Sequence, residues 1–152
     1  MRIISLFFMG FLLISCFSSK KISSFEFYDS GGNPYQLFSA GEKIKQEYNL
    51  LKKPKIVLVA TKERQSSELK KQLSAIYQVD AEELGFILIL TNAEQPDKSG
   101  YYTDKMTAKD ILNQDSFRIV IINEAARPIA SSNTPISSED LKNYLTKSSS
   151  GR

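Results

Sequence analysis

The chain has 152 residues and a formal net charge of +3, and this length allows one domain that can fold around a hydrophobic core without disulfides. Because it contains no histidine and a single cysteine, it cannot use a Ser-His-Asp or Cys-His nucleophile, a histidine-based metal site or an intrachain dithiol. Its lysines and glutamates are scattered, so no nucleic-acid partner is expected, and no cofactor or metal is expected either.

The N-terminal sixteen residues are dominated by an apolar run. Arg2 precedes the run, which covers residues 3–14 and ends at Ser15 and Cys16. The run is too short to span a bilayer comfortably, because a helix rises about 1.5 Å per residue and the hydrocarbon core is about 30 Å thick. This layout is typical of a secretory signal peptide, and we predict that residues 1–15 are removed on export.

The end of that run, Leu13-Ile14-Ser15-Cys16, resembles the lipobox of bacterial lipoproteins. In that family the cysteine is acylated and becomes the new N-terminus. The resemblance implies that Cys16 carries lipid, palmitate included, and tethers the chain to the inner or outer membrane of the cell envelope, facing the periplasm. Residues 16–24 would then be the lipidated cysteine and a polar tether. The alternative is an ordinary signal peptide, or a signal anchor, with an incidental cysteine.

A folded domain is predicted from residue 25 to residue 147, followed by a disordered tail over residues 148–152. It opens with extended segments on both sides of the turn-forming sequence Ser-Gly-Gly-Asn-Pro, which predicts a β-hairpin over residues 25–37. Residues 41–50 are expected to hold a helical turn or two. The domain is therefore predicted to begin with a hairpin ahead of its main sheet.

The central part of the domain predicts a parallel βαβ unit. A continuous β-branched run at residues 55–60 is typical of a strand buried on both faces, and residues 85–90 form a second such run. Between them, apolar residues recur at steps of four and three over residues 63–77, which predicts an amphipathic helix that packs on the strands.

Polar connections follow the predicted helix and the second predicted strand. Residues 80–83 carry three acids and are interpreted as an acidic loop, too sparse in oxygen ligands to bind calcium. Residues 91–102 form a polar loop that is long for a connection and ends in Tyr101 and Tyr102. These tyrosines could form a partner-binding patch, but partly buried tyrosines covering the sheet edge are the favoured interpretation.

The C-terminal part predicts a short helix, a hairpin and a final helix. The short helix starts at residues 106–111, with Thr107 as its cap. Residues 117–122 and 128–130 are apolar strands separated by a short polar connection, which favours an antiparallel hairpin. Residues 136–145 combine a capping sequence with apolar residues on one face, and they predict the last helix.

The resulting order β-α-β-α-β-β-α resembles the thioredoxin fold over roughly residues 53–147. The resemblance implies an α/β three-layer sandwich with a mixed sheet, preceded by a β-hairpin like the one that opens periplasmic thioredoxin-like and peroxiredoxin-like proteins. Residues 117–124, followed by residues 127–130 and 135–137, are also similar to the end of a family of short exported proteins described only as a domain of unknown function.

The chain departs from redox-active thioredoxin-like proteins at two places. Those proteins place a Cys-x-x-Cys pair where the first buried strand meets its helix, because the helix N-terminus lowers the thiol pKa. Residues 60–66 of this chain contain no sulfur there. The same proteins place a cis-proline before the third strand, where this chain has Asn-Gln-Asp-Ser at residues 113–116. The resemblance therefore implies a domain without redox activity, because Cys16 lies outside it.

The loop after the first buried strand is the best candidate binding site on fold grounds, because ligands in α/β sheets dock at strand ends and helix N-termini. Thr61 and Ser66 could cap the helix or bind an anion, and Lys62 and Arg64 could add positive charge. Asp115 would lie near this loop and could pair with Arg64. The favoured alternative is a capped and solvated loop, and no residue is assigned a catalytic role.

The sequence is compatible with three functions. The leading hypothesis is a membrane-tethered envelope lipoprotein that binds a partner, possibly another envelope protein, and has no redox activity. A second hypothesis is a non-redox envelope enzyme, such as a hydrolase that uses carboxylates near Asp115 and Glu63. The third is a surface-exposed adhesin, which the sequence does not distinguish from the first.

Overall fold

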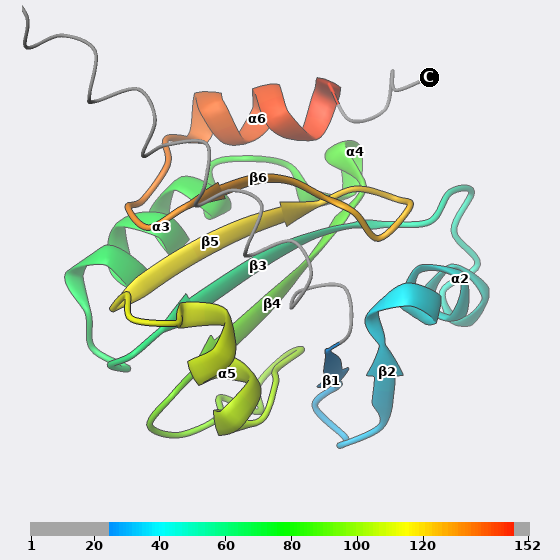
Figure 1. Cartoon of the computed structure of the whole chain (residues 1–152). Coiled ribbons are helices and arrows are strands. Elements are labelled where there is room, and N and C mark those ends of the chain that lie inside the picture. The colour runs from blue at the N-terminus through cyan, green and yellow to red at the C-terminus, as the bar shows by residue number, and fades with distance from the viewer. Residues whose placement is uncertain (1–24, 148–152) are drawn as a thin grey trace, which may run out of the picture.

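A computed structural model of the chain describes residues 25–147 and contains a four-stranded mixed sheet (Figure 1). The strands lie in the order β4-β3-β5-β6, and their bounds are Lys55–Thr61 for β3, Phe86–Asn92 for β4, Phe117–Ile122 for β5 and Pro128–Ser132 for β6. β3 and β4 run parallel, whereas β5 is antiparallel to β3 and to β6. The predicted βαβ unit and C-terminal hairpin are confirmed. The predicted signal peptide, lipidated cysteine, tether and tail lie outside the described residues.

Helices cover both faces of this sheet, as a three-layer sandwich requires. α3 (Ser67–Tyr77), α4 (Ala81–Leu84) and α6 (Ser138–Lys147) lie on one face, and α2 (Leu37–Glu47) and α5 (Lys105–Leu112) lie on the other. Figure 1 shows α3 and α6 above the sheet and α5 below it. Within residues 25–147, every helix is too short or too polar to cross a membrane.

β3 is buried along its whole length and divides its side chains between two hydrophobic clusters. Ile56, Leu58 and Ala60 pack with residues of α2 and α5, whereas Val57 and Val59 pack with residues of α3 and α6. Successive strand residues point to opposite faces, so a strand covered by helices on both sides needs an uninterrupted apolar run. This is why the run at residues 55–60 identified the central strand.

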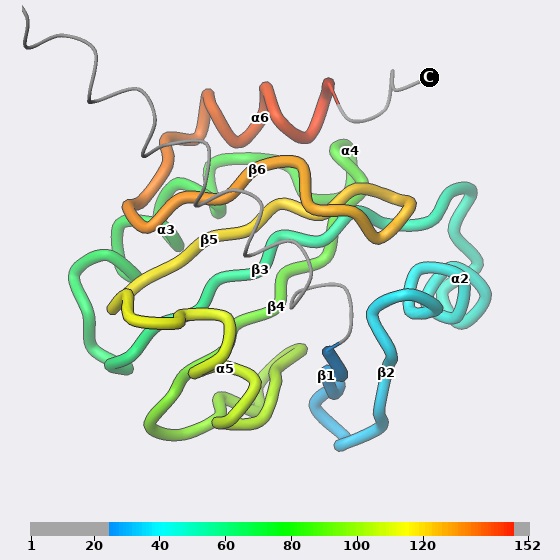
Figure 2. The backbone as a smooth tube through the Cα atoms, in the orientation of Figure 1, coloured from blue at the N-terminus to red at the C-terminus, as the bar shows by residue number. Residues whose placement is uncertain are grey.

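The predicted N-terminal hairpin is confirmed, with β1 at Glu26–Tyr28 and β2 at Pro34–Gln36 paired antiparallel. The Asp29 carboxylate closes the turn, because its Oδ1 accepts hydrogen bonds from the backbone N–H groups of Gly31 and Asn33, both at 2.9 Å. Figure 2 shows the hairpin on the α5 side of the sheet, away from α6.

Tyr101 and Tyr102 connect this hairpin to the main sheet. Tyr28 and Tyr102 exchange two backbone hydrogen bonds of 2.8 and 2.9 Å, and the Leu90 N–H donates to the Tyr101 carbonyl at 3.1 Å. The Tyr101 ring also packs edge-on against Phe27, with centroids 5.7 Å apart. The interpretation of these tyrosines as partly buried cover for the edge of β4 is therefore confirmed.

The starts of three helices differ from the sequence-based expectation. α2 begins at Leu37, so it is longer than the turns expected within residues 41–50. α3 begins at Ser67, four residues later than predicted, because Ser66 is its N-cap. α5 is capped by Asp104, whose carboxylate accepts the Thr107 N–H at 2.7 Å, and the prediction of Thr107 as the cap is wrong. In contrast, the cap predicted at the start of α6 is confirmed, since Ser137 Oγ accepts the Asp140 N–H at 3.1 Å.

The acidic segment after α3 is a helix rather than a loop. Asp80 Oδ1 accepts the N–H groups of Glu82 and Glu83, each at 3.0 Å, and so caps α4. α4 ends at Gly85, whose φ of 67° is in the left-handed region that glycine adopts without strain. The acidic residues are therefore explained by helix capping and by the favourable effect of negative charge at a helix N-terminus.

Candidate functional site

The predicted binding loop lies where β3 ends and α3 begins. Ser66 Oγ accepts a hydrogen bond from the Leu69 N–H at 3.2 Å, which caps α3. The Lys62 N–H donates to the Ser116 carbonyl at 2.8 Å, so the connection between α5 and β5 lies beside this loop, as expected. Lys62 and Arg64 are exposed to solvent. The fold therefore brings these residues together at one end of the sheet.

Thr61 is directed into the protein at this corner. It is 1% exposed, and its hydroxyl accepts a hydrogen bond from Asn92 Nδ2 at 3.0 Å. Asn92 Oδ1 in turn accepts the backbone N–H groups of Glu94 and Gln95 at 2.8 and 3.0 Å. The Thr61 hydroxyl thus joins the ends of the two parallel strands, and the cap of α3 is Ser66.

Asp115 pairs with Arg118 rather than with Arg64. Asp115 Oδ2 lies 2.7 Å from Arg118 Nη2, and Arg118 is 9% exposed. Arg118 Nε is buried and has no hydrogen-bond partner within residues 25–147. The Asp115 carboxylate therefore balances a nearly buried guanidinium.

Arg64 lies close enough to Asp97, in the loop that follows β4, for its charge to affect that carboxyl group. Hydrogen bonds from Ser99, including one from its N–H at 3.1 Å, hold the pKa of Asp97 below its ordinary value, and the positive charge of Arg64 contributes in the same direction. Across residues 25–147, no group of three or more Cys, Asp or Glu side chains could hold a metal ion. Exposed charged side chains thus lie beside a capped helix at this corner, and a binding role for the loop stays a prediction.

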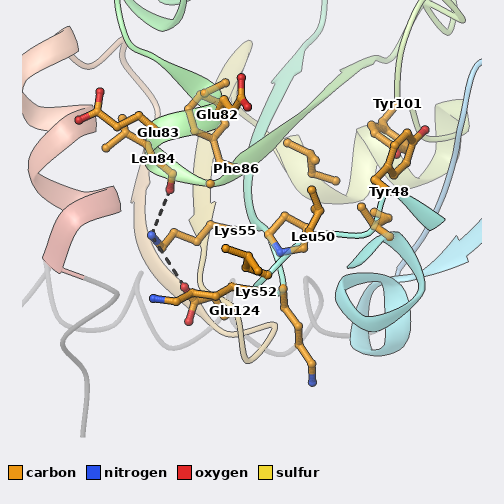
Figure 3. A pocket seen from close by; sticks show the side chains of 17 residues that line it. Tyr48, Leu50, Lys52, Lys55, Glu82, Glu83, Leu84, Phe86, Tyr101 and Glu124 are labelled. Carbon is orange, nitrogen blue, oxygen red and sulfur yellow. Dashed lines mark hydrogen bonds and ion pairs between the residues drawn. The ribbon is translucent and has the colours of Figure 1, made fainter. Parts of the chain in front are cut away.

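A cavity of about 720 Å³ lies at the opposite end of β3, and no prediction from the sequence pointed to it. Its walls come from the end of α2, the connection from α2 to β3, α4 with the start of β4, Tyr101, and Glu124 in the turn between β5 and β6 (Figure 3). This volume lies within the range of about 300–1,000 Å³ that is typical of small-molecule sites.

Lys55 places a buried positive charge at one side of this cavity. It is the first residue of β3 and is 6% exposed. Its Nζ donates to the Leu84 carbonyl at 3.2 Å and lies 3.9 Å from Glu124 Oε1 (Figure 3). Its position is fixed by β3, because its own N–H donates to the Gly85 carbonyl at 2.8 Å.

Two tyrosines lie at the other side of the cavity. Figure 3 shows Tyr48 and Tyr101 next to one another, with Leu50 between them and Lys55. Burial raises the pKa of Tyr101, and a hydrogen bond with Tyr48 raises it further, so Tyr101 stays neutral under physiological conditions. Ile44 and Ile87 also line the cavity. The arrangement combines an apolar, aromatic side with a cationic one.

One feature of the sequence could have indicated this cavity, namely the charged residue Lys55 at the start of an apolar strand. Lys55 was interpreted only as part of the buried run at residues 55–60. A lysine that opens a strand buried on both faces must find a partner or line a cavity, because a buried charge without partners is costly.

Comparisons with known proteins give the fold. No family model matches the sequence, and no curated protein matches it. The structure is similar to a secreted thiol-disulfide isomerase from Corynebacterium glutamicum, with a TM-score of 0.59 and 11% identity over 84% of each chain. It is also similar to the pneumococcal exposed lipoprotein thioredoxin from Streptococcus pneumoniae, with a TM-score of 0.54 and 12% identity over 81% of this chain and 98% of that one.

A thio-disulfide isomerase from Thermus thermophilus gives the same result, with a TM-score of 0.55 and 15% identity over 84% of this chain and 94% of that one. The chain therefore has a thioredoxin-like fold, as the element order predicted. At these identities the likeness concerns the fold alone. The similarity of residues 117–137 to a family of short exported proteins stays a prediction.

Proposed function

We propose that this protein is a membrane-tethered lipoprotein of the cell envelope, whose thioredoxin-like domain binds a partner or ligand and does not exchange thiols and disulfides. The observation that carries the proposal is the corner between β3 and α3. In redox-active members of this fold a thiol occupies this corner, whereas here Ser66 takes the N-cap position and residues 60–66 contain no sulfur.

The chemistry of disulfide exchange supports this proposal. Exchange requires a thiolate that attacks a disulfide sulfur, and the only cysteine in the sequence is Cys16. The Ser66 hydroxyl does not replace a thiolate, because it accepts the Leu69 N–H and the chain has no histidine to deprotonate it. A binding role therefore fits the domain better than a redox role.

The tether follows from the resemblance of residues 13–16 to a lipobox. The solved structures with this fold include one exposed lipoprotein and one secreted protein, which supports a place outside the cytoplasm. The hydrolase alternative is weaker, because the Asp115 carboxylate is already paired with Arg118. The adhesin alternative places the same domain outside the cell.

The redox part of the proposal is tested by insulin reduction in dithiothreitol. The full chain should give no turbidity above the reagent background, and turbidity above background would refute the proposal. A matched control is the double variant Ser66→Cys with Leu69→Cys, which places a Cys-x-x-Cys pair at the N-cap and third position of α3. This variant should gain activity, because the helix N-terminus lowers the pKa of the first thiol.

The tether is tested by labelling cells with radioactive palmitate. The natural chain should incorporate label, and Cys16→Ser should not. Protease added to intact cells then distinguishes a periplasmic domain from a surface-exposed one, because only the latter is digested. Label that persists in Cys16→Ser would refute acylation at this residue.

A further inference from the structure

The ammonium group of Lys55, at the edge of the cavity, has fewer hydrogen-bond acceptors than it has N–H donors. An ammonium group carries three N–H donors, and the Leu84 carbonyl takes one of them at 3.2 Å. Glu124 Oε1 lies 3.9 Å away, which is close enough for attraction but beyond hydrogen-bond distance. No further partner of Nζ is present within residues 25–147. A charged group that is only 6% exposed thus retains donor capacity on the edge of a cavity.

Glu124 is a replaceable partner for this ammonium. Its side chain is 36% exposed, compared with 7% for Lys55, and it lies in the turn between β5 and β6. It can therefore turn toward solvent at little cost, whereas the buried Lys55 ammonium is held by its hydrogen bond with the Leu84 carbonyl. An anionic ligand could therefore bind the Lys55 ammonium and displace the Glu124 carboxylate.

The side of the cavity opposite Lys55 is apolar. Tyr48, Leu50 and Tyr101 form an apolar wall there, and Figure 3 shows them on the opposite side of the cavity from the Lys55 ammonium, which is directed toward Leu84 and Glu124. A ligand that fills both sides needs one anionic end and an apolar body. The volume of about 720 Å³ accommodates a small molecule of that kind.

We propose that this cavity binds a small apolar monocarboxylate, with its carboxylate on Lys55 and its apolar body against Tyr48, Leu50 and Tyr101. A neutral ligand would leave the buried ammonium without a full set of acceptors, and a cationic ligand would be repelled by it. The inference is independent of the lipid tether and of the missing thiol, so its failure would leave the proposed function unchanged.

The test is calorimetric titration of the full chain in a nonionic detergent at neutral pH, with a blank titration of the detergent subtracted. The probes are 2-naphthoate and its neutral counterpart 2-naphthamide, which share one ring system and differ in charge. Decanoate serves as a second carboxylate that distinguishes an alkyl from an aryl ligand. Binding of either carboxylate with clear preference over the amide is expected, and binding of neither carboxylate would overturn the proposal.

Two variants with opposite expected effects make the test specific. Lys55→Met keeps an unbranched side chain, one heavy atom shorter, and removes its charge. It should weaken carboxylate binding about tenfold or more, the value of a charge-assisted hydrogen bond. Glu124→Gln removes the competing carboxylate and should strengthen binding. Lys142→Met, on the exposed side of α6 and away from the cavity, is the control and should bind as the natural chain does.

The variants also separate a binding defect from a folding defect. Thermal unfolding of each variant shows whether it is folded, and Glu124→Gln remains informative even if Lys55→Met does not fold. Equal affinity for naphthoate in Lys55→Met and the natural chain would overturn the proposal. So would weaker binding in Glu124→Gln, because it would mean that Glu124 assists the ligand.

Discussion

Gln72 and Ile136, which are 64 positions apart in the sequence, exchange two hydrogen bonds inside the protein. The Gln72 Nε2 donates to the Ile136 carbonyl at 3.2 Å, and its Oε1 accepts the Ile136 N–H at 2.8 Å. Gln72 is 0% exposed, so this side-chain amide acts as a substitute for a strand partner. It fixes the segment that leads into α6 against α3.

Replacing Gln72 by leucine should therefore lower the free energy of unfolding by about 2–4 kcal/mol, because two backbone groups lose their partners in a buried place. Urea unfolding measures this change. Gln78→Ala is the matched control, since Gln78 is exposed and its side-chain oxygen accepts a hydrogen bond from the Ser138 hydroxyl at 3.3 Å, also on the surface. The control should change the free energy of unfolding by less than about 0.5 kcal/mol, as is usual for surface substitutions. Equal effects of the two substitutions would contradict the structural role of Gln72.

The cap of α5 offers a direct comparison between the sequence-based expectation and the structure. Asp104→Ala should lower the free energy of unfolding by about 1 kcal/mol, because the Thr107 N–H loses its acceptor. Thr107→Ala should have a much smaller effect. Chemical unfolding measures the stability of the two variants. A larger loss of stability in Thr107→Ala than in Asp104→Ala would indicate that Thr107, and not Asp104, is the cap of α5.

The turn of the N-terminal hairpin should depend on pH through Asp29. Hydrogen bonds from Asn33, first from its side chain and then from its backbone, hold the pKa of Asp29 below its ordinary value of about 3.9. The folded state therefore binds this proton less tightly than the unfolded chain does. The contribution of Asp29 to stability is present above about pH 4 and is lost as the pH falls through the lower, folded value.

An NMR titration of the Asp29 carboxyl measures this effect. Asn33→Ala removes the side-chain donor and should bring the pKa of Asp29 back toward its ordinary value, although the backbone N–H of residue 33 remains as a donor. An unchanged pKa in this variant would show that the Asn33 side chain has no such effect.

The pair of Asp115 and Arg118 should behave as a largely buried ion pair. Asp115→Asn leaves a nearly buried guanidinium without its counter-charge and should lower the free energy of unfolding by about 2 kcal/mol, less than for a fully buried pair because Asp115 is 31% exposed. Adding Arg118→Met should recover most of this loss, since well-packed apolar side chains often replace such pairs without cost. A double-mutant cycle measures the coupling, and simple additivity would show that the two residues do not interact.

The central strands could be predicted because their burial on both faces forces an uninterrupted apolar run, as at residues 55–60. The start of α3 was placed too early because Glu63, Arg64 and Gln65 are good helix formers, and only the hydrogen bond of Ser66 shows where the helix begins. α4 was missed because four residues with two glutamates give no periodic signal. Local patterns thus identify long elements better than short ones or caps.

The two candidate sites also differ in how far they could be predicted from the sequence. The loop at residues 61–66 follows from element order, so the sequence could place Lys62 beside residue 116. The cavity at Lys55 depends on how the connection after α2 folds back, and on Tyr101 and Glu124 from distant parts of the chain. No local pattern contains that information, because it arises only when the helices and strands are packed together.

The short extended segment formed by Tyr101 and Tyr102 has a consequence for association between copies. Outer strands of a sheet expose unpaired N–H and C=O groups, which can template the addition of a strand from another molecule. Here the backbone of Tyr101 occupies the outer side of β4 at Leu90, and the backbone of Tyr102 is itself paired with β1. A strand from another molecule therefore cannot pair with β4 at this position without displacing Tyr101, which hinders edge-to-edge aggregation there. Such a hindrance matters most where many copies are held at high density.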